Sequence, residues 1–159
     1  MFQVGSNSIL EGRVDIYTIG FTKKNAQSFF KFIKSSNIST LIDVRLNNVS
    51  QLSGFAKRDD LKYFLKELCN TEYVHAPELA PTKEMLSAYK KGDVSWDIYE
   101  DKFLNLMSQR HIERIVKPSL LDNGCLLCSE HEPHLCHRRL VVEYLNENSD
   151  LGLKVKHLY

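Results

Sequence analysis

Residues 124–138 read GCLLCSEHEPHLCHR, and this segment determines the predicted fold. Gly124 to Cys128 is a short apolar run of the kind found in buried strands. A polar loop follows it, and from Leu135 to Asn146 apolar residues recur at helical spacing. The segment therefore predicts a strand that leads through a polar loop into the N-terminus of a helix.

The same order of strand and helix recurs before and after this segment. Further strands are expected at residues 14–19, 40–44, 72–75 and 154–158. Helical spacing covers residues 26–33, 61–68 and 96–107, with short helical turns near 85–89 and 112–116. Because strands alternate with helices, the strands should pair in parallel. We expect a single three-layer α/β domain with a mainly parallel central sheet of about five strands flanked by helices.

Some local details follow from the same patterns. Thr22 stands where an N-cap would begin the first helix, and Asp59 or Asp60 can cap the second. Leu68 continues the apolar stripe of that second helix and is expected to face the core.

The chain has 159 residues, of which 43% are hydrophobic, so it can bury one continuous core. No repeat or Pro/Gly-rich linker divides it. We expect residues 14–159 to form the single domain and residues 1–13 to be a loosely ordered lead-in.

Composition limits the possible partners and the compartment. The formal net charge is +1, so overall charge does not demand a polyanionic partner. No apolar run is long enough to span a membrane, and Met1 to Arg13 lacks the pattern of a signal peptide. We expect a cytoplasmic protein with reduced thiols and no membrane partner; the sequence does not indicate the oligomeric state.

Polar side chains gather where three strands are expected to end, which is where α/β sheets bind ligands. The helix N-terminus near Cys136 offers free backbone N–H groups and a positive dipole end. Guanidinium groups bind phosphate or carboxylate well. The predicted anion-binding residues are Arg45, Arg138, His137, Cys136 and Ser129.

Cys128 is the candidate nucleophile, because it ends a strand just before a helix N-terminus whose field lowers a thiol pKa. The alternative is a buried core cysteine. Cys136 could be the more acidic thiol of the two, or a half-buried cap residue. Glu130 and Asp43 are the acid–base candidates. Asp43 could instead form a structural pair with Arg45, and Glu130 could be a solvated loop residue.

A metal site is not expected. Cys125, Cys128, Cys136 and His137 have the residue types of a zinc site. However, side chains alternate along a strand, so Cys125 and Cys128 should point to opposite faces and cannot share one ion. Cys125 is expected in the core, and no cofactor is expected.

Two other functions remain open. Lys57, Arg58, Lys62 and Lys66 form a basic stretch that could bind nucleic acid or a protein partner, although such a run is usually a solvated face. Alternatively, Cys128 and Cys136 could carry out thiol redox chemistry if their sulfurs lie within disulfide reach.

The sequence also resembles a known family. The matching motifs are Thr18-Ile-Gly20, Leu41-Ile-Asp-Val-Arg45, Ser50, Gly54-Phe55, Cys128-Ser-Glu130, Pro133, Cys136-His-Arg138 and Val155-Lys-His157. They resemble domain-of-unknown-function family 488 (DUF488) over residues 15–159. The resemblance implies one α/β domain with a site built from the matched positions, and it implies no reaction. This chain has Phe21 and Thr22 where the family commonly has His-Ser, and Asn48 where it commonly has proline.

The sequence thus predicts an α/β protein with an anion-binding site at the strand ends. The leading interpretation is an enzyme or former enzyme that acts on a phosphate-bearing small molecule or nucleic acid.

Overall fold

The computed structural model describes residues 14–49 and 53–159. Within this part of the chain, five strands form one sheet in the order β3-β2-β4-β1-β5, and every pairing is parallel. The strands are β1 (Val14–Gly20), β2 (Thr40–Asp43), β3 (Glu72–His75), β4 (Gly124–Cys128) and β5 (Leu153–Leu158). The predicted five-strand parallel sheet is confirmed, each strand at its expected place within one or two residues.

Helices connect successive strands. They are α2 (Ala26–Ser35), α3 (Arg58–Phe64), α4 (Lys83–Lys90), α5 (Trp96–Arg110), α6 (Ile112–Ile115), α7 (Pro118–Leu121) and α8 (His137–Asn148). Two short 3-10 turns, η1 (Gly54–Ala56) and η3 (Pro77–Leu79), and one π-helical turn, η2 (Leu65–Cys69), complete the described elements.

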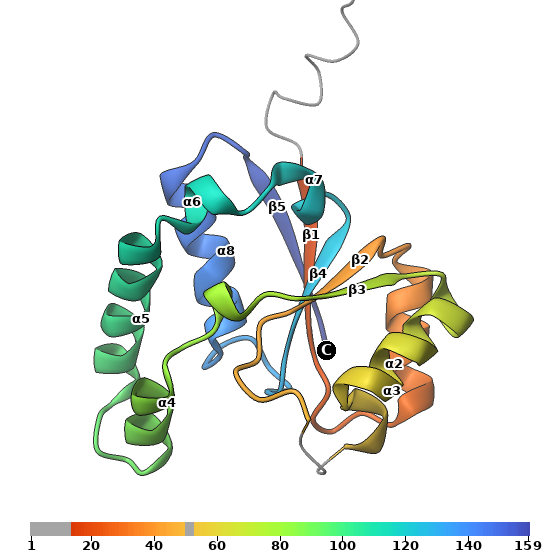
Figure 1. Ribbon diagram of the computed structural model, residues 1–159, viewed down its shortest axis with the longest axis horizontal. Helices are drawn as coiled ribbons and strands as arrows, with labels where there is room; N and C mark the ends of the chain where they lie inside the picture. Colours follow the sequence, from red (N-terminus) through yellow and green to blue (C-terminus); the bar gives the residue numbers. More distant parts are fainter. Residues whose placement is uncertain (1–13, 50–52) are drawn as a thin grey trace, which may run out of the picture.

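The sheet lies between two layers of helices. One core packs α2 and α3 against the sheet, and a separate core packs α5, α6 and α8 against its other face. Figure 1 shows these layers to the right and left of the sheet. The predicted three-layer α/β architecture is therefore present.

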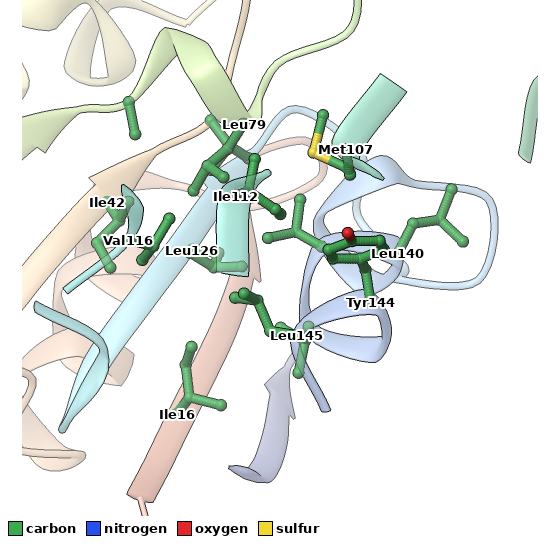
Figure 2. Packing of buried hydrophobic residues seen from close by; sticks show 14 of the residues in the cluster. Ile16, Ile42, Leu79, Met107, Ile112, Val116, Leu126, Leu140, Tyr144 and Leu145 are labelled. Carbon is green, nitrogen blue, oxygen red and sulfur yellow. The ribbon is translucent and has the colours of Figure 1, made fainter. Parts of the chain in front are cut away.

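Strand alternation separates the two cores. On β4, Leu126 and Cys128 belong to the core beneath α8, whereas Cys125 and Leu127 belong to the core beneath α2. Figure 2 shows Leu126 beside Leu145 of α8 in the first core. The expectation that Cys125 and Cys128 point to opposite faces is confirmed.

Three local predictions were wrong. Asn25, not Thr22, caps α2, and its side chain accepts a hydrogen bond from the Ser28 N–H. Neither Asp59 nor Asp60 caps α3; both lie in its first turn, after an N-cap at Lys57. Leu68 is 51% exposed because the chain widens into the π-helical turn η2, which rotates the apolar stripe away from the core.

Predictions for residues 1–13 and for Ser50 fall outside the described residues. None of the described helices combines the length and the apolar character needed to cross a membrane.

Candidate functional site

The candidate site lies at the carboxyl ends of β2 and β4, which are neighbours in the sheet. Asp43 at the end of β2 pairs with Leu127, the residue before Cys128. The chain leaves β2 towards α3 on one face and leaves β4 towards α8 on the other. Connections that diverge in this way open a crevice between the two strand ends.

A pocket of about 150 Å³ lies at this crevice. Most of the residues selected from the sequence line it, namely Arg45, Cys128, Ser129, Glu130, Cys136 and His137. Asp43 and Arg138 do not line it and are both fully buried. The structure therefore brings six of the eight predicted site residues to one pocket and places the other two behind it.

Cys128 has the surroundings of a stabilised thiolate. The donors that surround its sulfur are the Cys136 thiol and the backbone N–H groups of Ser129 and Glu130. These donors and the charge of Arg138 hold the Cys128 pKa below that of an ordinary thiol, although burial acts in the opposite direction. Cys128 is 6% exposed, and that exposed edge faces the pocket.

Cys136 is the N-cap of α8, as expected, and is buried. Burial raises its pKa, and the neighbouring Cys128 raises it further because Cys136 donates its proton there. The prediction that Cys136 could be the more acidic thiol is therefore not supported. The two sulfurs divide the roles of donor and acceptor.

His137 links α8 to the end of β2. Its Nε2 lies 2.8 Å from the carbonyl oxygen of Val44, so this nitrogen carries a proton and donates it. Cys128 Sγ lies 3.5 Å from Nδ1 and 3.8 Å from Nε2. Because these distances are nearly equal, the sulfur lies beside the ring and not along the lone pair of Nδ1.

Cys128, Cys136 and His137 also form the one possible metal-ligand group found among the described residues. Their ligand atoms lie within 4.8 Å of one another. Two sulfurs and one imidazole nitrogen suit zinc. The orientation of the His137 ring does not suit zinc. Its Nε2 is hydrogen-bonded to the Val44 carbonyl, and its Nδ1 is not aimed at the space between the sulfurs. His137 would have to turn before these residues could hold an ion.

Arg138 holds the loop between β4 and α8. Its NH1 donates to the Glu130 carbonyl at 2.5 Å, and its NH2 donates to the His131 carbonyl at 3.1 Å. Its Nε donates to Thr18 of β1 at 3.2 Å, and NH1 also lies 3.5 Å from Cys136 Sγ. The donors predicted to bind an external anion are therefore used within the protein.

The charge of Arg138 has no carboxylate partner among the described residues, since the salt bridges there involve other side chains. Arg138 is nevertheless 0% exposed. A buried cation of this kind favours negative charge nearby and disfavours further positive charge. Together with burial, it lowers the pKa of His157 and of Lys24, and it favours the thiolate of Cys128.

Asp43 and Arg45 form the structural pair that the sequence left open. Arg45 donates from Nε and NH2 to the two Asp43 oxygens, at 2.8 Å each. Tyr73 donates its hydroxyl to Asp43 at 2.5 Å, and the Arg45 guanidinium lies 5.3 Å from the ring centroid of Phe21. Asp43 therefore positions Arg45 at the pocket and is not itself open to a ligand there.

The loop after Cys128 is tied to the loop after β1. Thr22 donates its backbone N–H and its hydroxyl to the Ser129 carbonyl, at 3.1 and 2.6 Å. Glu130 is exposed and lines the pocket. Of the two predicted acid–base residues, Glu130 is the one that can meet a ligand.

Sequence reasoning missed one wall of the pocket. It consists of Leu86, Tyr89 and Lys90 from α4 and of Trp96 and Tyr99 from α5. Trp96 and Tyr99 stack with their ring centroids 5.2 Å apart. Helical spacing identified the α5 residues as core, and no local signal indicates that α4 and α5 fold back over the end of β4.

The basic stretch lies on α3 and η2, away from the pocket lining. Arg58 pairs with Asp59, and Lys66 pairs with Glu72, all four side chains being largely exposed. Two of its four cations are therefore partly neutralised by their neighbours.

Fold and site together define a doubly wound α/β protein with two cysteines and a histidine buried at the crevice between neighbouring strand ends. The family model described as "Domain of unknown function DUF488" matches residues 25–145. The chain belongs to this family, as the sequence resemblance predicted. Comparison with curated proteins and with solved structures gave no match.

The departures from the common family pattern have clear positions. Thr22 keeps a hydroxyl, which holds the Ser129 carbonyl, while Phe21 places an aromatic ring beside Arg45. Asn48 donates its side-chain amide to the Tyr73 hydroxyl at 3.1 Å and accepts the Arg58 backbone N–H at 2.7 Å. Thr22 thus holds the backbone of the loop after β4, Phe21 contacts Arg45, and Asn48 contacts Tyr73.

Gly20 offers a test of this loop packing. A Cβ at Gly20 would overlap the Glu130 carbonyl and lie 3.0 Å from Arg138 NH1. We expect Gly20→Ala to displace that carbonyl and to lower the free energy of unfolding by at least about 2 kcal/mol, since a buried charge loses an acceptor. Urea unfolding measures this change.

Gly54→Ala is the matched control, because no atom of the described residues, its two chain neighbours aside, lies within 4 Å of a Cβ built there. It should change the free energy of unfolding by no more than about 0.5 kcal/mol. Equal effects of the two substitutions would contradict the packing of Glu130 on Gly20.

Proposed function

We propose that this protein is an enzyme that uses the Cys128 sulfur as a nucleophile on a small substrate that carries an anionic group such as a phosphate. The observation that carries the proposal is the position of Cys128. Cys128 lines the pocket, and the Cys136 thiol and the N–H groups of Ser129 and Glu130 surround its sulfur. Such donors are typical of activated cysteines, because the thiolate is the reactive form.

The reaction is a displacement. The Cys128 sulfur forms a bond to the electrophilic atom of the substrate while the leaving group departs with its electron pair. Glu130 is the acid–base candidate that can reach a ligand, since it is exposed and lines the pocket. His137 has its Nε2 engaged by Val44 and stands beside the sulfur.

Charges around the pocket support an anionic group on the substrate. Arg45 and Lys90 line it, against the single carboxylate of Glu130. Asp43 offsets much of the Arg45 charge, so Lys90 is the cation that should attract an anionic ligand more strongly. The start of α8 at Cys136 and His137 adds the positive end of a helix dipole.

The aromatic wall supports a substrate with a flat, partly apolar portion. Tyr89, Trp96 and Tyr99 line the pocket and pack on one another. Aromatic faces stack with planar rings, including nucleobases. A nucleotide combines such a ring with a phosphate and fits both features.

Binding of nucleic acid or of a protein through the basic stretch has less support. Arg58 and Lys66 are engaged by Asp59 and Glu72. Of the aromatic residues in or next to this stretch, Phe55 and Phe64 pack against the core, and Tyr63 is exposed.

Alkylation tests the nucleophile. Iodoacetamide at about pH 7 should modify Cys128 before the other three cysteines, because its lowered pKa supplies more thiolate. Peptide mass spectrometry identifies the modified residue. Cys128→Ser should abolish the fast reaction, and Cys125→Ser, on the opposite face of the sheet, should leave it unchanged. Faster labelling of Cys69 or Cys125 would contradict the proposal.

Protection from alkylation tests the anion. Inorganic phosphate should slow the modification of Cys128 by occupying the pocket. Lys90→Gln should weaken the apparent affinity for phosphate by about 5-fold. This factor corresponds to roughly 1 kcal/mol, the interaction energy of two opposite charges close to water.

Lys91→Gln is the matched control for that experiment, since Lys91 is exposed, adjacent in sequence and absent from the pocket lining. Its affinity for phosphate should equal that of the unchanged protein. If phosphate gives no protection at any concentration, the anionic substrate is wrong even where Cys128 reacts as expected.

A further inference from the structure

Cys128 and Cys136 are two thiols that meet beside the same pocket. Both are buried, and their sulfurs lie within 4.8 Å of each other. Cys128 ends β4, and Cys136 caps α8, so two elements that pack together hold the two sulfurs in place. Both residues line the pocket.

The other two cysteines have no such partner. Cys125 lies on the opposite face of the sheet, beneath α2. Cys69 lies at the end of η2, where its sulfur is 3.6 Å from the Phe30 carbonyl. All four cysteines are free thiols. Only Cys128 and Cys136 are placed to react with each other.

The distance allows a disulfide after a small movement. A disulfide bond is about 2.05 Å long, so the sulfurs must close a gap of at most about 3 Å. Rotation of the two cysteine side chains, with a shift of Cys136 at the N-cap of α8, must supply this change.

The pocket limits the oxidant that reaches these sulfurs. Its volume of about 150 Å³ is narrow, and Cys128 and Cys136 are only 6% and 2% exposed. Hydrogen peroxide and small organic hydroperoxides can enter such a space, whereas a bulky peptide disulfide would have to open it.

We propose that Cys128 and Cys136 form a dithiol–disulfide couple that reduces a small hydroperoxide. The proposal rests on the assignment of Cys128 as the nucleophile under the proposed function and adds a second reaction at the same site. In the substrate reaction Cys136 serves only as a donor to Cys128, and in this second reaction it becomes a reactant.

The electron balance is as follows. The Cys128 thiolate attacks the terminal oxygen of the hydroperoxide; a sulfur–oxygen bond forms, the oxygen–oxygen bond breaks, and an alcohol or water leaves after protonation by solvent. Cys128 is then a sulfenic acid. The Cys136 sulfur attacks the Cys128 sulfur, the sulfur–oxygen bond breaks, and water leaves with the Cys136 proton. The two thiols have supplied two electrons, and an external small thiol restores them by exchange.

Arg138 assists the second step. Its NH1 lies 3.5 Å from Cys136 Sγ, so its charge favours the Cys136 thiolate at the moment of attack. Because Cys136 already lies next to Cys128, it captures the sulfenic acid before a second peroxide can oxidise it further.

One equivalent of hydrogen peroxide, added to the full-length reduced protein and followed by a thiol-blocking reagent and mass spectrometry, tests the couple. The protein mass should fall by two hydrogen atoms, with a single linked peptide pair that contains Cys128 and Cys136. Dithiothreitol should reverse the change. Cys69→Ser and Cys125→Ser should give the same disulfide as the unchanged protein.

Cys136→Ser should stop the reaction at the sulfenic acid, which dimedone traps on Cys128, and Cys128→Ser should leave Cys136 reduced. The couple would be overturned if iodoacetamide alkylates Cys128 rapidly but peroxide gives no disulfide, or oxidises Cys128 directly to the sulfinic acid. Either result would leave the assignment of Cys128 as the nucleophile intact. Failure of Cys128 to react with both iodoacetamide and peroxide would overturn both proposals.

Discussion

The structure of the site depends on the buried guanidinium of Arg138. This side chain is completely enclosed and crosses from α8 to β1, where it meets the hydroxyl of Thr18. On the way it binds the carbonyls of Glu130 and His131. Burying a cation is costly unless its donors are satisfied, and here backbone carbonyls satisfy them. The loop after β4 is therefore held in one conformation by the requirement to solvate a charge inside the protein.

This arrangement has an electrostatic consequence for Cys128. Carbonyl dipoles satisfy the hydrogen bonds of Arg138 but do not cancel its charge, and no carboxylate of the described chain pairs with it. The thiolate of Cys128 is the nearby group that can supply negative charge, and the N–H groups of Ser129 and Glu130 stabilise it directly. The sheet topology brings the loop to a crevice, because the connections after β2 and β4 run to opposite faces. One buried arginine thus couples the fold of the loop to the chemistry of its cysteine.

Sequence patterns predicted the sheet and brought together most of the residues that line the pocket, because both depend on local rules. Strand alternation placed Cys125 and Cys128 on opposite faces, and the end of β4 marked the crevice. The role of Arg138 could not be predicted in this way: a local sequence does not tell whether a guanidinium turns out to a ligand or in to carbonyls from its own loop. The aromatic wall was also missed, since Trp96 and Tyr99 follow the same helical spacing as core residues. Leu68 shows the converse error, where a π-helical turn broke a regular pattern.

The donors around Cys128 and the charge of Arg138 should keep this thiol ionised more readily than an ordinary one. The pH titration of the Cys128 thiol in the folded protein, followed by the carbon NMR signal of its Cβ, tests it most directly. A midpoint below the ordinary thiol value of about 8.5 is predicted, with an upward shift in folded Arg138→Gln. A midpoint at or above that value in the unchanged protein, or no shift in the variant, would contradict the claim.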